Sequence, residues 1–237
     1  MQLDHVNAII FDLDDTLYPE VQYVYSGFRA VSSWLSKMGL TNNLGSDECF
    51  EFMQSTFKSE GRGKVFDRLL SHLSLSSSNY LETLIYIYRT HVPSNLVLWN
   101  EMAEVIVNLS KKKLKLGIVT DGIYVTQKAK TDLLLKGLPF DAIVHTDSLG
   151  PQNWKPSTAP FKVICNLLGT TPMHAVYVGD NPIKDFAGAN RLGMQTIWYN
   201  PQKKIHYFEQ PDFKPDLEIN KPQSIIEFIY EFNKYSK

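Results

Sequence analysis

Four aspartates that follow two short apolar runs are the first candidates for chemistry. Asp12 and Asp14 follow a run that ends Ile-Ile-Phe, and Asp180 and Asp185 follow a run that ends Tyr-Val-Gly. A carboxylate can bind a hard divalent cation, attack an electrophile, or carry a proton as an acid or a base. The four acids therefore predict a site that combines a metal ion with nucleophilic or proton-transfer chemistry.

Hydroxyl, amide and ammonium groups follow two further segments. Thr120, Asp121 and Gly122 end a third apolar run and offer a hydroxyl and several backbone amides. Such a turn can cradle the oxygens of a phosphate group, so these residues are candidates for substrate binding. Lys155 lies in a Trp-Lys-Pro loop and supplies a cation that can approach the same place.

The close spacing of the acids has an ordinary explanation and a functional one. Single carboxylates are common at helix N-termini, where the helix dipole favours negative charge. However, an extended backbone places Asp12 and Asp14 on one side, and convergence with Asp180 and Asp185 brings several like charges together. At about 4 Å each pair repels by ~1 kcal/mol in water and ~4 kcal/mol at an effective dielectric of about 20. A bound cation or shifted protonation is then required, and all-oxygen ligands favour Mg²⁺ over zinc.

The elements that position these residues have the pattern of a parallel sheet. Aliphatic and β-branched runs without strict alternation predict strands that are buried on both faces, at 6–13, 114–120, 142–146, 175–179 and 195–199. Segments of helical period lie between the later runs, at 100–112, 124–136, 160–168 and 185–192. This alternation predicts an α/β fold with a Rossmann-like parallel sheet, in which ligands bind at the carboxyl ends of the strands.

A long segment separates the first predicted strand from the second. It contains roughly 100 residues, although a crossover helix needs only about a dozen. Amphipathic patterns fill it at 21–37, 47–60, 64–73 and 80–91, and a closing helix is predicted at 223–235. We therefore expect an inserted helical domain, residues 19–92, on a core formed by residues 1–18 and 93–237.

The sequence resembles the haloacid dehalogenase superfamily in four motifs that occur in order over nearly the whole chain. Asp12-Leu13-Asp14-Asp15-Thr16 resembles the first motif, Thr120 the second, Lys155 the third, and the segment Gly-Asp-Asn-Pro-Ile-Lys-Asp at 179–185 the fourth. The inserted helices match the position of the C1 cap of that family. Asp15 stands where many members carry glycine, which leaves both chemical carboxylates in place.

The resemblance implies a Mg²⁺-dependent phosphatase that works through an aspartyl-phosphate. Asp12 would attack phosphorus, while Asp14 would protonate the leaving oxygen and later deprotonate the hydrolytic water. Mg²⁺ would be held by Asp12, the main-chain carbonyl of Asp14, and Asp180. Lys155 would pair with Asp12 and the phosphate, and Asp185 would hold a metal-bound water or orient Lys155. Dehalogenases of the superfamily lack a carboxyl at the position of Asp14, which favours phosphate chemistry.

Two cations in the expected helical domain are further candidates for substrate binding. The turn at 61–64 carries Arg62 and Lys64 but lacks Walker spacing and a preceding strand, so it is not a P-loop. Either residue would contact a distal anionic group of the substrate, and a solvated basic turn is the alternative. Three residues after the first motif either line an entrance or pack between the domains: Tyr18, Glu20 and Tyr23.

We therefore expect hydrolysis of a small phosphorylated metabolite, either a sugar phosphate or a nucleotide. One alternative is a sugar phosphomutase, which passes the phosphoryl group of the same intermediate to a second hydroxyl. A second is a non-catalytic phospho-aspartate signalling domain, which lacks both an inserted cap and a residue like Asp14. A third is an inactive scaffold, which the complete set of motif residues disfavours.

Composition and charge describe an ordinary folded protein and argue against several partners. Hydrophobic residues make up 43% of the 237 residues, and 24 basic residues against 25 acidic ones give a net charge of −1. We expect no nucleic-acid or membrane partner, because no global positive field and no apolar run near 18 residues exists. The N-terminus has no leader pattern, so a cytoplasmic location is expected, and Cys49 and Cys165 are expected to be buried thiols. The oligomeric state stays open.

Overall fold

Residues 5–208 and 210–235 are described by the computed structural model, and their contacts divide the chain into two units. The larger unit comprises Met1–Pro19 and Val97–Lys237, and the smaller unit comprises Glu20–Leu96. The sequence placed these divisions after residues 18 and 92. The two stretches of the larger unit meet where the Trp99 amide donates a hydrogen bond to the Leu17 carbonyl, at 3.0 Å.

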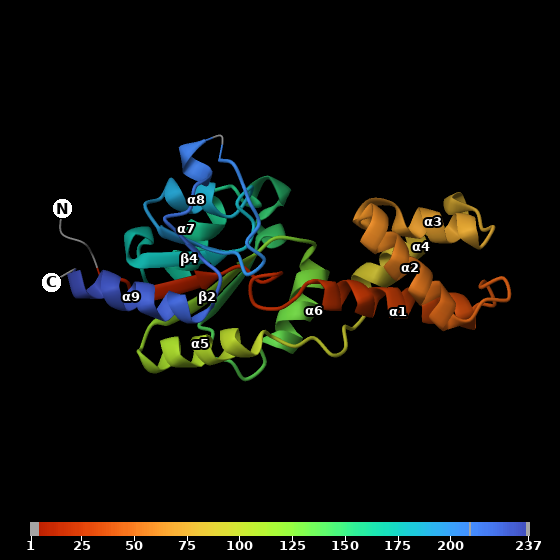
Figure 1. The fold of residues 1–237 in the computed structure, drawn as a ribbon, viewed down its shortest axis with the longest axis horizontal. Helices are drawn as coiled ribbons and strands as arrows, with labels where there is room; N and C mark the ends of the chain where they lie inside the picture. The colour runs from red at the N-terminus through yellow and green to blue at the C-terminus, as the bar shows by residue number, and fades with distance from the viewer. Residues whose placement is uncertain (1–4, 209, 236–237) are drawn as a thin grey trace. The chain divides into compact units, whose positions relative to one another are not determined.

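The larger unit is built on a six-stranded parallel sheet with the strand order β3-β2-β1-β4-β5-β6 (Figure 1). Its strands are β1 (Ala8–Phe11), β2 (Lys115–Thr120), β3 (Ala142–His145), β4 (Ala175–Gly179), β5 (Gln195–Tyr199) and β6 (Leu217–Ile219). The predicted Rossmann-like α/β fold with an inserted helical domain is confirmed. The sequence did not predict β6, because three residues with a central glutamate give too short a pattern.

Helices cover both faces of this sheet. They are α5 (Asn100–Lys111), α6 (Tyr124–Leu134), α7 (Ala159–Leu168), α8 (Phe186–Asn190) and α9 (Gln223–Tyr235), with short 3-10 turns η2 (Thr146–Leu149), η3 (Pro151–Asn153), η4 (Pro172–His174) and η5 (Pro211–Phe213). Figure 1 shows α7 and α8 on one side of the sheet, with α5 and α9 side by side on the other. Because both faces are covered, the strands carry apolar side chains in both directions, as the uninterrupted apolar runs predicted.

Strand register brings the expected chemical residues to one edge of the sheet. Phe11, the last residue of β1, lies beside Ile118 of β2 and Val178 of β4. The segments that continue from these parallel strands therefore leave the sheet at the same edge. Asp12 is fixed there by its amide, which donates to the Val178 carbonyl at 2.9 Å.

The smaller unit is a bundle of α-helices with its own core. It contains α1 (Val21–Lys37), α2 (Ser46–Glu60), α3 (Val65–His72) and α4 (Ser77–Thr90), and a 3-10 turn, η1 (Arg62–Lys64), precedes α3. Gly27 of α1 lies against the ring of Tyr88 of α4, where a Cβ atom would come within 2.4 Å of a ring carbon. The missing side chain thus allows these two helices to approach closely.

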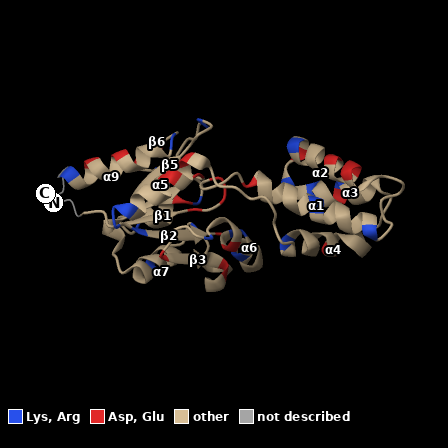
Figure 2. Cartoon of the chain, turned by 90° about the horizontal axis from the view of Figure 1, so that it is seen from below, with Lys and Arg blue, Asp and Glu red and all other residues tan. Residues whose placement is uncertain are grey.

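The distribution of charged residues and the state of the two cysteines agree with what the composition predicts. Basic and acidic residues are interspersed along the helices of both units (Figure 2), in keeping with a net charge of −1. Cys49 and Cys165 are buried free thiols, as expected. Among the described residues, the helices are too short or too polar to traverse a lipid bilayer.

Candidate active site

A buried lysine joins two aspartates at the carboxyl edge of the sheet. Lys155 Nζ donates hydrogen bonds to Asp12 Oδ1 and to Asp185 Oδ1, each at 2.7 Å. The hydroxyl of Tyr177, from β4, lies 2.9 Å from the same ammonium nitrogen. The Lys155 side chain is completely buried. Burial alone would lower its pKa, but Asp12 and Asp185 raise the pKa well above its usual value, so this lysine is a permanent cation.

The local backbone explains how Asp185 reaches this lysine. Asp185 stands immediately before α8, and its second oxygen, Oδ2, accepts a hydrogen bond from the Asn181 amide at 2.8 Å. Gly179 ends β4 beside it, and a Cβ atom there would lie 2.5 Å from Asp185 Oδ2. Only glycine leaves room for the carboxylate to fold back on the strand end. Both oxygens of Asp185 are therefore already engaged.

Asp121 holds the loop that carries Lys155. Its Oδ1 accepts hydrogen bonds from the Thr146 hydroxyl at 2.7 Å and from the Lys155 amide at 3.2 Å. The Asp121 carboxylate thus braces neighbouring segments. The predicted role of Asp121 and Gly122 in substrate binding rests on the backbone amides of this turn, and it stays a prediction.

Three of the predicted acids converge. Oxygens of Asp12, Asp180 and Asp185 all lie within 4.8 Å of one another. Burial, followed by the charges of the other two acids, raises the pKa of Asp180 to about 8. Burial also raises the pKa of Asp12 to about 6, with Lys155 opposing the rise and Asp185 adding to it. The cluster thus accumulates negative charge that the described side chains do not fully neutralise.

The donor set at this cluster fits a divalent cation. Asp12 Oδ2 is buried and has no hydrogen-bond partner among the described residues. An unpaired buried oxygen is costly, and a carboxylate oxygen in this position is a suitable ligand for a hard cation. Asp180 supplies further oxygens nearby. The oxygens on offer are those that Mg²⁺ prefers, and nitrogen or sulfur ligands are absent from the cluster.

The carboxylate of Asp14 lies outside this cluster, contrary to the expectation that all four aspartates would share one space. Its Oδ1 accepts hydrogen bonds from the Tyr18 hydroxyl at 2.6 Å and from Lys130 Nζ at 2.8 Å. Its Oδ2 accepts from Lys130 Nζ and from Gln127 Nε2, each at 2.9 Å. Burial acts to raise the pKa of Asp14, but Lys130 and the hydrogen bonds of Tyr18 and Gln127 bring it below its usual value. These contacts draw the carboxylate toward α6 rather than toward Asp12.

Thr120 lies at the end of β2 and is buried. Its hydroxyl oxygen accepts a hydrogen bond from Gln127 Nε2 at 2.5 Å. Because that contact uses an oxygen lone pair, the hydroxyl proton is left for another acceptor. The predicted role of Thr120, donation to a phosphate oxygen, is compatible with this arrangement and stays a prediction.

Sequence reasoning missed Gln127 and Lys130. They face inward from α6, on which the buried positions Gln127, Lys130, Thr131 and Leu134 follow helical spacing. The available signal was polar residues at positions where an amphipathic helix normally carries apolar ones. Buried polar residues need hydrogen-bond partners. Because α6 follows Thr120 closely in the sequence, those partners could have been expected near Thr120.

The two predicted cap cations belong to the smaller unit. Arg62 donates through Nη1 to Glu20 Oε1 at 2.7 Å and forms a second contact with Oε2 of the same residue. Glu20 thus neutralises the Arg62 guanidinium within this unit. Lys64 is exposed at the end of η1. Substrate binding by Arg62 and Lys64 stays a prediction.

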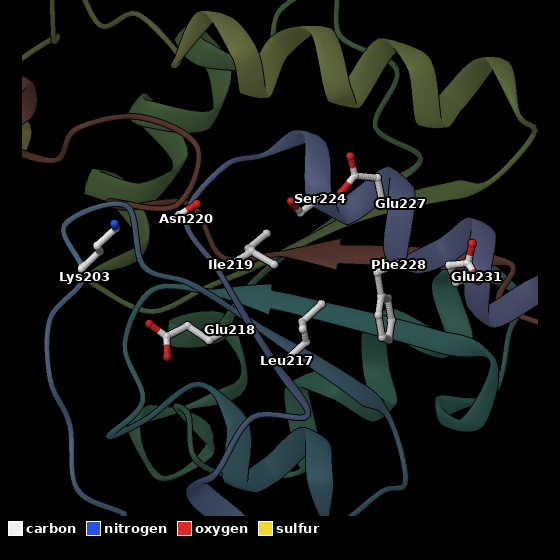
Figure 3. Close-up of a pocket in the computed structure, with 9 residues that line it drawn as sticks. All are labelled: Lys203, Leu217, Glu218, Ile219, Asn220, Ser224, Glu227, Phe228 and Glu231. Atoms are coloured by element: carbon white, nitrogen blue, oxygen red, sulfur yellow. The ribbon is translucent and has the colours of Figure 1, made fainter.

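A separate groove lies along β6 and α9, with a volume of about 710 Å³ (Figure 3). Glu218, Glu227 and Glu231 line it together with Lys203, and Leu217 and Phe228 give it apolar surface. Its lining contains none of the residues that converge around Lys155. The groove is therefore separate from the acidic cluster.

Comparison with known sequences identifies the family of the chain. A family model for haloacid dehalogenase-like hydrolases matches residues 9–199. The chain is 30% identical to a glyceraldehyde 3-phosphate phosphatase of Methanopyrus kandleri, over 97% of this chain and 99% of the relative. It is 24% identical to the pyrophosphatase PpaX of Bacillus cereus, again over 97% and 99% of the two chains.

A solved structure supports the fold independently. The magnesium-bound HAD-hydrolase YfnB of Bacillus subtilis superposes with a TM-score of 0.67 at 20% identity, covering 95% of this chain and 99% of that one. At this level of identity the likeness concerns the fold alone. The family match, the relatives and the fold agree with the motifs found along the sequence, and the chain belongs to the haloacid dehalogenase-like hydrolases.

Proposed function

We propose that this hydrolase is a Mg²⁺-dependent phosphatase that cleaves the phosphomonoester of a small metabolite through an aspartyl-phosphate on Asp12. The observation that carries the proposal is the environment of the Asp12 carboxylate. Oδ1 accepts a hydrogen bond from Lys155 at 2.7 Å, and Oδ2 is buried without a partner among the described residues. A carboxylate that is held at one oxygen by a lysine and whose other oxygen is free to bind a cation is suited to nucleophilic attack beside that cation.

In the first step, an oxygen of Asp12 forms a bond to phosphorus as the ester P–O bond breaks. Asp14 gives a proton to the departing oxygen, which leaves as an alcohol, and Asp14 becomes a carboxylate. The Thr120 hydroxyl donates a hydrogen bond to a phosphoryl oxygen. The positive charge of Lys155, whose three N–H groups already donate to Asp12, Asp185 and Tyr177, stabilises the anionic phosphoryl group beside Asp12. Donors that are already fixed before reaction stabilise the transition state without reorganisation.

In the second step, a water oxygen forms a bond to phosphorus as the bond to Asp12 breaks. The water proton moves to Asp14, inorganic phosphate leaves, and both carboxyl groups return to their starting states. The ionised form of Asp14 is required here, and Lys130 with the hydrogen bonds of Tyr18 and Gln127 lowers the pKa of Asp14 and favours that form. The first step needs the protonated form, so Asp14 must take up its proton against this lowering. General acid and base catalysis of this kind typically contributes about 10²- to 10⁴-fold to the rate.

Mg²⁺ would neutralise the repulsion between an anionic substrate and Asp12 and polarise the phosphoryl oxygens. Asp12, Asp180 and the main-chain carbonyl of Asp14 would hold it. Asp185 would orient Lys155 rather than bind the metal directly, because its oxygens already accept hydrogen bonds from Lys155 Nζ and the Asn181 amide.

Small sugar phosphates are the substrate class that we propose, and triose phosphates are the first to test. The relative from Methanopyrus kandleri is named for glyceraldehyde 3-phosphate, and the relative from Bacillus cereus is named for pyrophosphate. The amides of Asp121 and Gly122 are the proposed contacts for the phosphate. Arg62 and Lys64 are the proposed contacts for a distal anionic group, in those substrates of the panel that carry one.

Phosphate release by the purified protein tests this proposal. The panel contains glyceraldehyde 3-phosphate, hexose phosphates, nucleotides and pyrophosphate, each with Mg²⁺ and with EDTA. We expect Mg²⁺-dependent release from at least one sugar phosphate and no release by Asp12→Asn. Acid quenching during turnover should show a phosphoryl group on the peptide that contains Asp12. Undiminished activity of Asp12→Asn, or full activity in EDTA, would overturn the proposal.

A further inference from the structure

The further inference concerns two buried polar residues of α6, Gln127 and Lys130. They are three positions apart, so they lie on the same face of the helix, and their relative exposures are only 1% and 2%. An ammonium group and an amide in such a place must be paired to be tolerated. Both are paired with Asp14, which the proposed function makes the acid and base.

Lys130 holds both oxygens of the Asp14 carboxylate. Its Nζ atom lies 2.8 Å from Oδ1 and 2.9 Å from Oδ2. A cation that contacts both oxygens fixes the direction of the carboxylate plane as well as its position. The Tyr18 hydroxyl adds a further hydrogen bond to Oδ1, at 2.6 Å.

Gln127 connects Asp14 to Thr120. Its Nε2 atom lies 2.9 Å from Asp14 Oδ2 and 2.5 Å from Thr120 Oγ1. An amide nitrogen has two protons, and these contacts use both. One rigid group therefore fixes the distance between the proposed proton-transfer carboxylate and the hydroxyl proposed to bind the phosphoryl group.

We propose that Gln127 and Lys130 are positioning residues that place Asp14 for proton transfer relative to the phosphoryl group at Thr120. The inference rests on the proposed function, because it requires Asp14 to be the acid and base. Lys130 acts through the Asp14 carboxylate that it contacts, and Gln127 acts through the same carboxylate and through the Thr120 hydroxyl. A misplacement of about 1 Å can reduce a rate about 100-fold, which sets the scale of the expected effect.

The variants are chosen so that charge, fold and helix context can be separated. Lys130→Met removes the cation at similar length, Gln127→Leu removes the amide, and Lys130→Arg keeps a cation that can still reach both oxygens. Lys128→Met is the matched control, because Lys128 is exposed on the same helix and pairs with Asp132 instead. Thermal unfolding and circular dichroism establish that each variant is folded.

The readout is the burst of p-nitrophenolate from p-nitrophenyl phosphate in rapid mixing with Mg²⁺. This leaving group departs without a proton, so formation of the aspartyl-phosphate is spared and its hydrolysis is slowed. For Lys130→Met and Gln127→Leu we expect a burst close to one equivalent, a kcat about 10- to 100-fold lower, and a KM within about twofold of the wild-type value. Lys130→Arg should recover most of the rate, and Lys128→Met should match the wild type.

An alkyl phosphate such as glycerol phosphate gives the complementary result. Its leaving oxygen needs the proton from Asp14, so both steps are slowed and no burst is expected in Lys130→Met. The double variant is read with p-nitrophenyl phosphate, from which Asp14→Asn still forms the aspartyl-phosphate. The slow residual hydrolysis of that aspartyl-phosphate should not become slower when Lys130→Met is added, because a residue that acts through Asp14 has nothing left to position.

Three results would overturn the inference. A burst that shrinks in proportion to the steady-state rate means a smaller folded fraction, and hence a structural role. Wild-type kinetics in Lys130→Met and Gln127→Leu mean no role, and an additive loss in the double variant with Asp14→Asn means an effect elsewhere. Retained activity in Asp12→Asn would instead contradict the proposed function, so the two failures are distinguishable.

Discussion

Lys155 Nζ and Asp185 Oδ1 are 2.7 Å apart, and both side chains are completely excluded from solvent. The same lysine contacts Asp12, so one cation serves two buried carboxylates that come from different segments of the chain. The two buried carboxylates depend on this lysine, because an unpaired buried charge is expensive.

Replacing Lys155 by methionine should therefore damage both fold and activity. We expect the metal-free protein to lose about 3–5 kcal/mol in its free energy of unfolding, because Asp12 and Asp185 lose their buried partner. Urea denaturation in EDTA measures this loss. The control is Lys162→Met on the exposed face of α7, which should change the free energy of unfolding by less than about 0.5 kcal/mol.

Asp12→Asn should abolish catalysis without lowering the stability of the fold. Asp12→Asn removes the proposed nucleophile, so turnover should be abolished, while the fold should be retained. Burial raises the pKa of Asp12 to about 6, which means that its charged form is disfavoured in the folded protein. The melting temperature of the metal-free variant at pH 8 should thus equal or exceed that of the wild type. A large drop in melting temperature would contradict the reasoning.

Asp14→Asn should also abolish turnover without loss of fold, but for a different reason. The amide cannot give or take a proton, and one of its two atoms would present donors to Lys130 or Gln127. We expect no measurable phosphate release from an alkyl phosphate. Circular dichroism and the melting temperature provide the test of the fold, and near-normal turnover would exclude Asp14 as acid and base.

The acidic cluster should make the metal-free protein less stable as the pH rises. Burial, Asp185 and Asp12 raise the pKa of Asp180 to about 8 from 3.8. The folded state then binds more protons than the unfolded chain between about pH 4 and pH 8, so the free energy of unfolding falls as the pH increases through about 8. Bound Mg²⁺ displaces this proton, and its affinity should rise with pH over the same range.

Thermal melts at pH 6 to 9, with EDTA or Mg²⁺, measure this dependence. The increase in melting temperature caused by Mg²⁺ should grow with pH in the wild type, and Asp180→Asn should remove most of that growth. A Mg²⁺ effect that is constant over this range, or that weakens with pH, would contradict the assignment of the cluster as the metal site.

Gly179→Ala should disturb the position of Asp185 only through the space that the added Cβ atom occupies. A Cβ atom there would lie 2.5 Å from Asp185 Oδ2, so Asp185 must move away from Lys155. Overpacking of this kind usually costs about 1–3 kcal/mol, and activity should fall with it. Gly63→Ala is the control, since nothing lies within 4 Å of the added carbon. Equal stability of the two variants would contradict the prediction.

The regular elements were predictable because their signals are local. The pattern at 21–37 coincides with α1, and the apolar run at 175–179 coincides with β4. Such strands lie between two layers of helices, so each carries apolar residues on both faces and is visible in the sequence. In contrast, β6 has three residues and a glutamate at its centre, and it is defined by pairing with β5.

The site was predictable where it depends on strand ends and not where it depends on tertiary contacts. Asp12 and Asp180 converge because parallel strands deliver them to one edge. The direction of Asp14 depends on Lys130, which lies 116 positions away in the chain and in no motif. Likewise, the hydrogen bonds of the Asp121 carboxylate with Thr146 and the Lys155 amide depend on the fold, and no local pattern in the sequence indicates them.

The hydrogen bond between the Trp99 amide and the Leu17 carbonyl has an implication for the history of this chain. The two points at which the polypeptide leaves and re-enters the larger unit are adjacent, so that unit is continuous without the residues between them. A shortened protein, in which a short linker near these two residues replaces the smaller unit, should still form the sheet and the acidic cluster at its edge. During evolution the smaller unit could therefore be exchanged or altered while the acidic cluster of the larger unit keeps its structure.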